Sequence, residues 1–185
     1  MDRVLDTWLG RQYAEGMALC AASDVLALLP EPGRRPPQRF IARFSSPTMV
    51  RIGPPGSPVT RWDGFAVLFQ FPSDYLRSAP DAARIVSLLA PLHAFHPNVA
   101  PPFICIGRIV PGTGLCELIY RVHEIMTFRK VTPREDDALN PDACVWARNN
   151  APLSLLSAAP LLRRPVAFSV EQIHPQEVQR EAHRN

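Results

Sequence analysis

Cys105 is the residue in this sequence whose type and setting best suit covalent chemistry. It follows Asn98 by seven positions and lies in a short apolar segment with no clear helical or strand pattern. A thiol in a loop can accept an acyl group as a thioester, and a nearby side-chain amide can donate a hydrogen bond to the oxyanion of the tetrahedral intermediate. The residue types and their spacing therefore predict acyl transfer through Cys105, with Asn98 as the amide donor.

Three other roles stay open for these residues at the level of sequence. Because it is flanked by isoleucines, Cys105 also fits a small buried hydrophobic residue. A cysteine hydrolase would need a histidine base, for which His96 and His123 are the candidates. A metal site would draw on five side chains: Cys105, Cys116, Cys144, His93 and His123. Zinc ligands usually come in close pairs, however, and these cysteines are 11 and 28 residues apart, so we expect no metal and no cofactor.

Composition and charge exclude several classes of protein. Of the 185 residues, 46% are hydrophobic and the formal net charge is only +3. No basic run is interleaved with aromatic side chains, so we expect no nucleic-acid partner. The opening MDRVLD is not typical of a secretory signal, and no stretch of about 18 apolar residues is present that would span a membrane. We therefore expect a cytoplasmic protein with reduced thiols and no membrane partner.

The elements expected to position Cys105 begin with helix and then change to strand. Apolar spacings of three and four over residues 2–29 predict one helix or two, with a possible break near Gly16. From residue 38 the period changes to two, which predicts two short strands joined at 45–47 and a strong strand at 64–72. These three strands predict an antiparallel meander, and for the whole domain we expect about four strands.

The second half of the chain predicts two helices around a less regular middle. Residues 81–94 indicate a helical or irregular insertion, and residues 114–128 predict an amphipathic helix. Asn140 and Pro141 are typical of an N-cap and a first helical position, which predicts a helix running toward Asn149. Beyond Pro165 the pattern fades into a polar tail.

Four motifs follow one another between Gly53 and Asn149. They are GPPGSP at 53–58 with GF at 64–65, FPSDY at 71–75, HPN at 96–98 with Cys105 after it, and DDALN at 136–140 before a helix. In this order and spacing they resemble the ubiquitin-conjugating enzyme family. The resemblance implies the α+β UBC-like fold, with an N-terminal helix, a four-stranded antiparallel meander, an active-site loop and a central helix. The corresponding single domain would cover residues 1–160, followed by a partly disordered C-terminal extension over 161–185.

The resemblance also implies a reaction and roles for named residues. Cys105 would accept the C-terminal glycine of a ubiquitin-like modifier from an activating enzyme and pass it to an amine of a target protein. Asn98 would stabilise the oxyanion or support the loop, and Asp137 would orient the incoming amine or help to remove its proton. Three further residues would hold the active site in shape: His96, Pro97 and Asn140.

The chain departs from the family in several places. Leu76 follows Tyr75 where the family usually has proline, the stretch 76–95 is long, and no tryptophan follows Cys105 at the usual distance. Prolines also interrupt the segment where the family has paired C-terminal helices. These departures leave the surfaces for the acceptor and the partners undefined.

Composition suggests a source and a simple test. Among 20 basic residues only Lys130 is a lysine, and richness in arginine, alanine and proline is typical of high-GC bacteria. Bacterial members of the family sit beside genes for an activating enzyme, a ubiquitin-like modifier and a deconjugating peptidase, some of them in phage defence, and the resemblance implies the same context here. With one lysine we expect little self-modification.

The alternative to a conjugating enzyme is a non-catalytic UBC-like module that binds a ubiquitin-like protein.

Overall fold

A computed structural model describes residues 2–78, 80–156 and 158–162. The helices and strands are, in order, α1 (Arg3–Ala21), β1 (Leu26–Pro30), β2 (Arg39–Arg51), β3 (Val59–Gln70), α2 (Ala82–Ile85), β4 (Val86–Ala90), β5 (Val99–Ala100), β6 (Phe103–Ile104), α3 (Leu115–Met126), α4 (Pro141–Asn150) and α5 (Pro152–Leu156). Most of the expected C-terminal extension, residues 163–185, lies outside the described residues.

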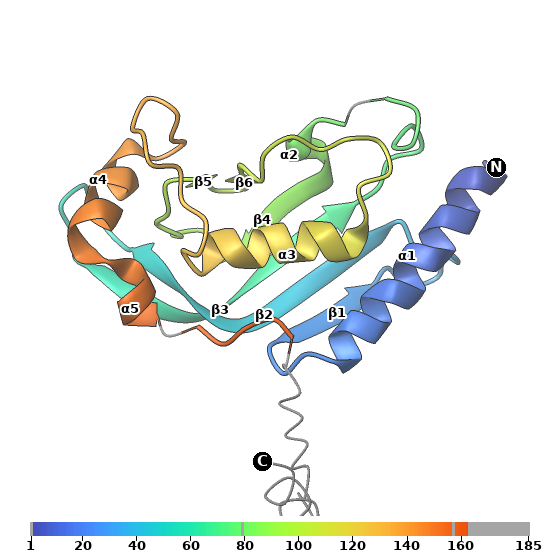
Figure 1. The fold of residues 1–185 in the computed structure, drawn as a ribbon, viewed down its shortest axis with the longest axis horizontal. Coiled ribbons are helices and arrows are strands. Elements are labelled where there is room, and N and C mark those ends of the chain that lie inside the picture. Colours follow the sequence, from blue (N-terminus) through green and yellow to red (C-terminus); the bar gives the residue numbers. More distant parts are fainter. Residues whose placement is uncertain (1, 79, 157, 163–185) are drawn as a thin grey trace, which may run out of the picture.

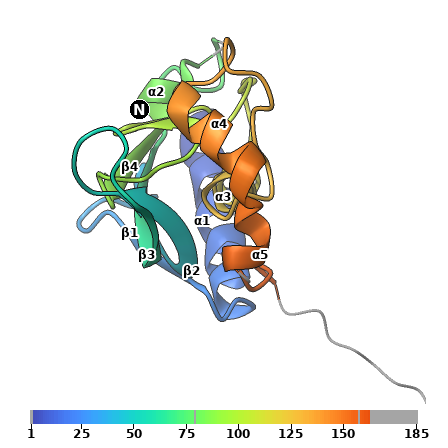
Figure 2. The same cartoon turned by 90° about the vertical axis from the view of Figure 1, so that its left-hand side faces the viewer.

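A four-stranded antiparallel sheet in the order β1-β2-β3-β4 forms one layer of the fold. Each strand pairs with the next along the chain, which confirms the expected meander and the mixed α/β class. Helix α3 lies across one face of the sheet. Helix α1 lies beside β1 at one end of the molecule, and α4 and α5 lie at the other end of the molecule (Figure 1). Turned by 90°, the same helices lie on one side of the curved sheet (Figure 2).

The main hydrophobic core lies between α3 and the inner face of the sheet. Alternating residues of β2, such as Phe40 and Phe44, are buried there while their neighbours face outward. From α3, Leu118, Ile119 and Val122 are fully buried against them. Burial of this apolar surface is what holds the helix on the sheet.

Strand β2 is continuous, where two short strands were expected. The register shifts between Phe44 and Pro47, which marks an irregularity of the β-bulge type rather than a turn. Opposite it, Gly64 has a φ of +90°, a conformation that a side chain would strain. Inside the irregularity, the Ser46 hydroxyl and His123 Nε2 are 2.9 Å apart and share a buried hydrogen bond. The serine-proline sequence therefore bends β2 without ending it.

The expected helix over residues 2–29 is wrong in its last part. Helix α1 runs unbroken to Ala21, and residues Leu26–Pro30 form the edge strand β1. No break occurs at Gly16, because α1 packs closely there: a Cβ on Gly16 would meet side-chain atoms of Leu28 and Leu115 at 2.9 Å. The glycine that weakens the helix locally is thus needed for contact with β1 and α3.

The expected insertion at 81–94 is also corrected. Only Ala82–Ile85 are helical, and Val86–Ala90 form β4, the fourth strand of the sheet. The apolar residues Val86 and Leu88 face the core in alternation, a pattern too short to distinguish from a helical face by sequence.

The two downstream helices agree with the expectation. Helix α3 covers Leu115–Met126 of the expected 114–128, and α4 covers Pro141–Asn150 with Asn140 as its N-cap. The Asn140 side-chain oxygen accepts a hydrogen bond from the backbone N–H of Ala143 at 3.1 Å. Among the described residues, none of the helices has the length and apolar character needed to cross a membrane.

Candidate functional site

Backbone pairing with the end of β2 holds the segment that leads into the HPN tripeptide. The N–H of Phe95 donates to the carbonyl of Met49 at 2.8 Å, and the N–H of Arg51 donates to the carbonyl of His93 at 3.0 Å. These bonds flank an antiparallel bridge between Val50 and Ala94, so residues 93–95 pair with the end of β2. The tripeptide therefore begins at a position set by the sheet.

The short hairpin of β5 and β6 then returns the chain to Asn98. Its register pairs Val99 with Ile104, and the next backbone bond runs from the N–H of Cys105 to the carbonyl of Asn98 at 2.8 Å. Cys105 is exposed, whereas Ile104 and Ile106 on either side are buried. The flanking isoleucines thus anchor the loop, and the thiol is the part of it that faces solvent.

Both polar atoms of the Asn98 side chain bond to Thr132. The amide nitrogen donates to the Thr132 hydroxyl at 2.6 Å, and the amide oxygen accepts the backbone N–H of Thr132 at 2.8 Å. Asn98 is only 6% exposed. This paired contact joins the Cys105 loop to the segment that follows α3. One N–H of the amide remains for another acceptor.

His96 is fully buried and structural in its contacts. Its Nδ1 accepts the backbone N–H of Asn98 at 2.9 Å, so the neutral ring carries its proton on Nε2. Nε2 is buried without a hydrogen bond of ordinary geometry among the described residues. Burial lowers the pKa of His96 to about 3, and the Lys130 backbone opposes only part of that shift. A ring in this setting is a weak general base, which favours a positioning role.

The segment between α3 and α4 contacts the tripeptide at three points. Besides the Thr132 contact, the backbone N–H of Asn140 donates to the carbonyl of Pro97 at 3.1 Å. Phe128, at a φ of 58°, places its ring 4.2 Å from that of His96. The segment 127–140 is therefore tied to the HPN tripeptide at its beginning and its end.

Asp137 is the expected site residue that the structure does not join to the others. Its side chain is exposed and forms an ion pair with Arg134, at 3.6 Å. No hydrogen bond or ion pair links its carboxylate to the HPN tripeptide or to Cys105 within the described residues. Asp137 lies three residues before Asn140, so it shares a loop with an anchored residue and points its charge to solvent.

Arg51 links three parts of this region. Its guanidinium carbon lies 4.1 Å from the centre of the Phe95 ring, and it forms an ion pair with Asp142 at 3.3 Å. Because Asp142 lies in the first turn of α4, this contact holds the start of that helix next to the chain that enters the HPN tripeptide. A favourable cation–ring contact of this kind contributes about 0.5–2 kcal/mol.

The remaining cysteines and histidines serve other contacts. Cys116 lies in α3, and the buried Cys144 in α4 donates to the carbonyl of Thr132 at 3.3 Å. His123 shares its hydrogen bond with Ser46 and not with a cysteine. Within the described residues no group of three histidine, cysteine, aspartate or glutamate side chains lies close enough to hold a metal.

Thr132 and Arg51 are the contacts that sequence reasoning missed. Thr132 lies 34 residues from Asn98 and within no motif, so only the folded chain shows that the two pair. Arg51 had no distinguishing feature beyond its place at the end of an apolar strand. In chemical terms, the region combines an exposed thiol on Cys105, a fixed side-chain amide on the residue whose backbone bonds to Cys105, and an anchored acidic loop.

Comparison with known proteins adds no family to this geometry. No protein-family model matches the sequence, and a search of curated proteins finds no match either.

Proposed function

We propose that this protein is a UBC-like conjugating enzyme that carries a ubiquitin-like modifier as a thioester on Cys105. The supporting observation is the bond from the N–H of the exposed Cys105 to the Asn98 carbonyl, which joins the backbone of the thiol-bearing residue to that of the HPN asparagine. A buried structural cysteine would not need solvent access. The expected order of N-terminal helix, meander, thiol-bearing loop and central helix is compatible with the UBC-like fold.

The first step is thioester exchange. The Cys105 thiolate attacks the carbonyl carbon of a modifier whose C-terminal carboxyl group is already a thioester on an activating enzyme. The carbon–sulfur bond to Cys105 forms, the bond to the activating enzyme's sulfur breaks, and that sulfur leaves as a thiolate. No cofactor takes part in this exchange, because the energy of the acyl bond is retained.

The second step transfers the modifier to an amine of a target protein. A neutral amine attacks the thioester carbonyl, an amide forms, and Cys105 leaves as thiolate while the nitrogen loses a proton. Because Thr132 engages both polar atoms of the Asn98 amide, the contacts favour support of the loop as its main role, with one N–H left for the oxyanion. Asp137, exposed in the adjacent loop, is the carboxylate available to orient the amine.

Intact mass spectrometry with the activating enzyme, the modifier and ATP tests this proposal. We expect an adduct of one modifier mass that reductant removes and that Cys105→Ala does not form. Cys20→Ala is the matched control, since Cys20 is also a free thiol but lies at the end of α1. An adduct that persists in Cys105→Ala would contradict the assignment of the cysteine.

The same experiment separates the alternative function. If partners shown to be active give no adduct, but the modifier still binds the protein in a titration, the chain is a non-catalytic module that recognises a ubiquitin-like protein. Proposed partners are thus the modifier, its activating enzyme and a protein target, in a bacterial conjugation system of the kind that serves in defence against phage.

A further inference from the structure

An apolar pocket of about 460 Å³ lies between the segment that follows α3 and the helices α4 and α5. The residues that line it include Phe128, Thr132, Cys144, Ala147 and Arg148. This volume is within the range of about 300–1,000 Å³ that is usual for small-molecule sites, which are mainly apolar with a few polar groups. The motifs that point to Cys105 do not account for it.

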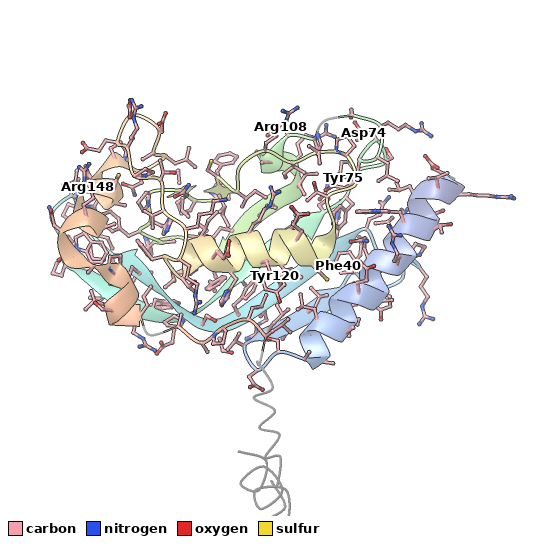
Figure 3. All side chains as sticks on the ribbon, viewed as in Figure 1. Phe40, Asp74, Tyr75, Arg108, Tyr120 and Arg148 are labelled. Carbon is pink, nitrogen blue, oxygen red and sulfur yellow. The ribbon has the colours of Figure 1, made fainter. Side chains whose placement is uncertain are left out.

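The lining indicates the chemistry of a ligand. Among the described residues that line the pocket, Arg148 is the only charged one, and its guanidinium is already paired with Glu135. Figure 3 shows Arg148 on α4, at the end of the molecule opposite Asp74. Because the described lining offers no unpaired charge, an ionic ligand would lose hydration there without gaining a partner. A neutral and mainly apolar molecule meets no such cost.

The pocket shares a wall with the candidate functional site. Thr132 lines the pocket and also holds both polar atoms of the Asn98 side chain. Cys144, another lining residue, bonds to the carbonyl of Thr132. Phe128 lines the pocket and lies against His96. A molecule that moves this wall therefore moves the groups that position Asn98.

We propose that this pocket binds a neutral, mainly apolar small molecule, and that its occupancy alters the position of Asn98 through Thr132. The binding itself does not depend on the proposed conjugating activity. A failure to bind thus leaves that activity untouched, and the absence of a thioester leaves the binding untouched.

Benzophenone is a suitable probe, since it is neutral and apolar, carries one carbonyl acceptor and crosslinks to nearby C–H bonds under ultraviolet light. We expect crosslinks in the full-length protein to map, by peptide mass spectrometry, to residues 128–133 and 144–154. The anion 4-benzoylbenzoate keeps the same rings, and we expect it to bind at least about tenfold more weakly, a difference of about 1.4 kcal/mol. Equal binding of the two, or crosslinks mainly elsewhere, would overturn the proposal.

Two substitutions on α4 provide the matched pair. Ala147→Phe places a ring in the pocket, whereas Val145→Phe adds the same ring at an exposed position two residues away. We expect the first to reduce benzophenone binding about tenfold or more and the second to leave it unchanged. Thermal unfolding of both variants verifies that they are folded. Unchanged binding in folded Ala147→Phe would refute the site.

The coupling to Asn98 has its own readout. In ¹⁵N-labelled protein, we expect benzophenone to shift the side-chain amide signals of Asn98, and Thr132→Val to remove most of that shift while binding persists. If benzophenone binds in the pocket but the Asn98 signals stay fixed, the coupling to the site is refuted. Crosslinking that increases on dilution would show that a second copy of the chain fills the pocket, and would also overturn the proposal.

Discussion

Two regions of this molecule are held together by different forces. The aromatic corner consists of Trp8, Phe40, Phe71 and Tyr75, with ring centres 4.9–6.2 Å apart and all four side chains buried. The site loops consist of residues 94–105 and 127–140 and are joined mainly by hydrogen bonds around Asn98. Buried aromatic packing thus holds the corner together, whereas the geometry around Cys105 depends on a few polar contacts.

The corner also contains a buried polar contact of its own. The hydroxyl of Tyr75, in the FPSDY motif, donates to the carbonyl of Thr113 at 2.7 Å, and burial raises the pKa of Tyr75 to about 12. Figure 3 shows Tyr75 above the beginning of α3, near the N-terminal helix. The motif therefore serves to fasten the chain that enters α3, far from the loops at the other end.

The largest expected effect comes from breaking the corner. Phe71→Ala removes a ring that contacts Trp8, Phe40 and Tyr75, and we expect a loss of about 3–5 kcal/mol in the free energy of unfolding, measured with urea. The exposed Leu92, replaced by alanine, should cost less than about 0.5 kcal/mol. If the two variants lose similar stability, the contrast between the regions is wrong.

A smaller loss in the free energy of unfolding is expected in acid, where the two buried histidines, His96 and His123, are protonated. Burial, with a smaller contribution from Arg129, lowers the pKa of His123 to about 4, and burial lowers that of His96 to about 3. In the unfolded chain each titrates near pH 6.5, so the unfolded state binds more protons below that pH. The stabilising effect of the neutral rings is therefore complete above about pH 6.5, and it is lost as the pH falls through 6.5 toward 4 and 3.

Urea unfolding at several pH values tests this sign. For His123 alone we expect a loss on the order of 3 kcal/mol between pH 7.5 and pH 4, and a flatter profile in His123→Gln. His93→Gln is the control. His93 is exposed and, like His123, lies next to β2, where its carbonyl accepts the N–H of Arg51. A profile for His123→Gln as steep as that of the wild type would contradict the assignment.

Replacement of Thr132 should change the position of the Asn98 side chain with little change in the stability of the fold. Thr132→Val removes the hydroxyl that Asn98 contacts but keeps the backbone N–H, so we expect a cost of only about 1 kcal/mol in folding. Under the proposed function, transfer from the thioester to a free amine should slow about tenfold while the amount of thioester is unchanged, a difference of about 1.4 kcal/mol in the barrier. Thr132→Ser keeps the hydroxyl and should transfer the modifier at the wild-type rate. A failure of serine to do so would show that the hydroxyl is not what matters.

The smallest expected effect is at Lys130, the only lysine of the chain. It is exposed in the loop that follows α3, where replacement should not disturb packing. We expect little self-modification in the wild type and no measurable change in transfer to other proteins in Lys130→Arg, both measured by mass spectrometry. Extensive ladders of self-conjugate would contradict this.

The elements that could be predicted from the sequence are those whose signals are local. The helices α3 and α4 followed from apolar spacing and from the Asn140 cap, because those signals are local. Strand β1 was mistaken for helix, since Leu26 and Leu29 also have the spacing of a helical face, and only pairing with β2 decides between the two. In β4, the same ambiguity hid the fourth strand.

At the site, residue types and spacing in the sequence indicated the candidate residues, but the sequence did not indicate which residues contact them. The spacing of Asn98 and Cys105 suggested that they lie close together, and the β5–β6 hairpin brings their backbones into contact. Thr132 could not be found, because its bond to Asn98 spans 34 residues and depends on how α3 ends. Asp137 was expected to orient the incoming amine or help to remove its proton, a role that the described contacts leave as a prediction.

The seam between β2 and the segment before the HPN tripeptide has a consequence for how this protein can diverge. Its two bonds, from Phe95 to Met49 and from Arg51 to His93, join main-chain atoms only. Main-chain pairing is available to every residue except proline as a donor, so these two bonds survive an exchange of side chains that keeps the packing of Met49 and Phe95 and the contacts of Arg51. Under that condition, residues of this segment can change while the strand spacing that leads to the thiol stays the same.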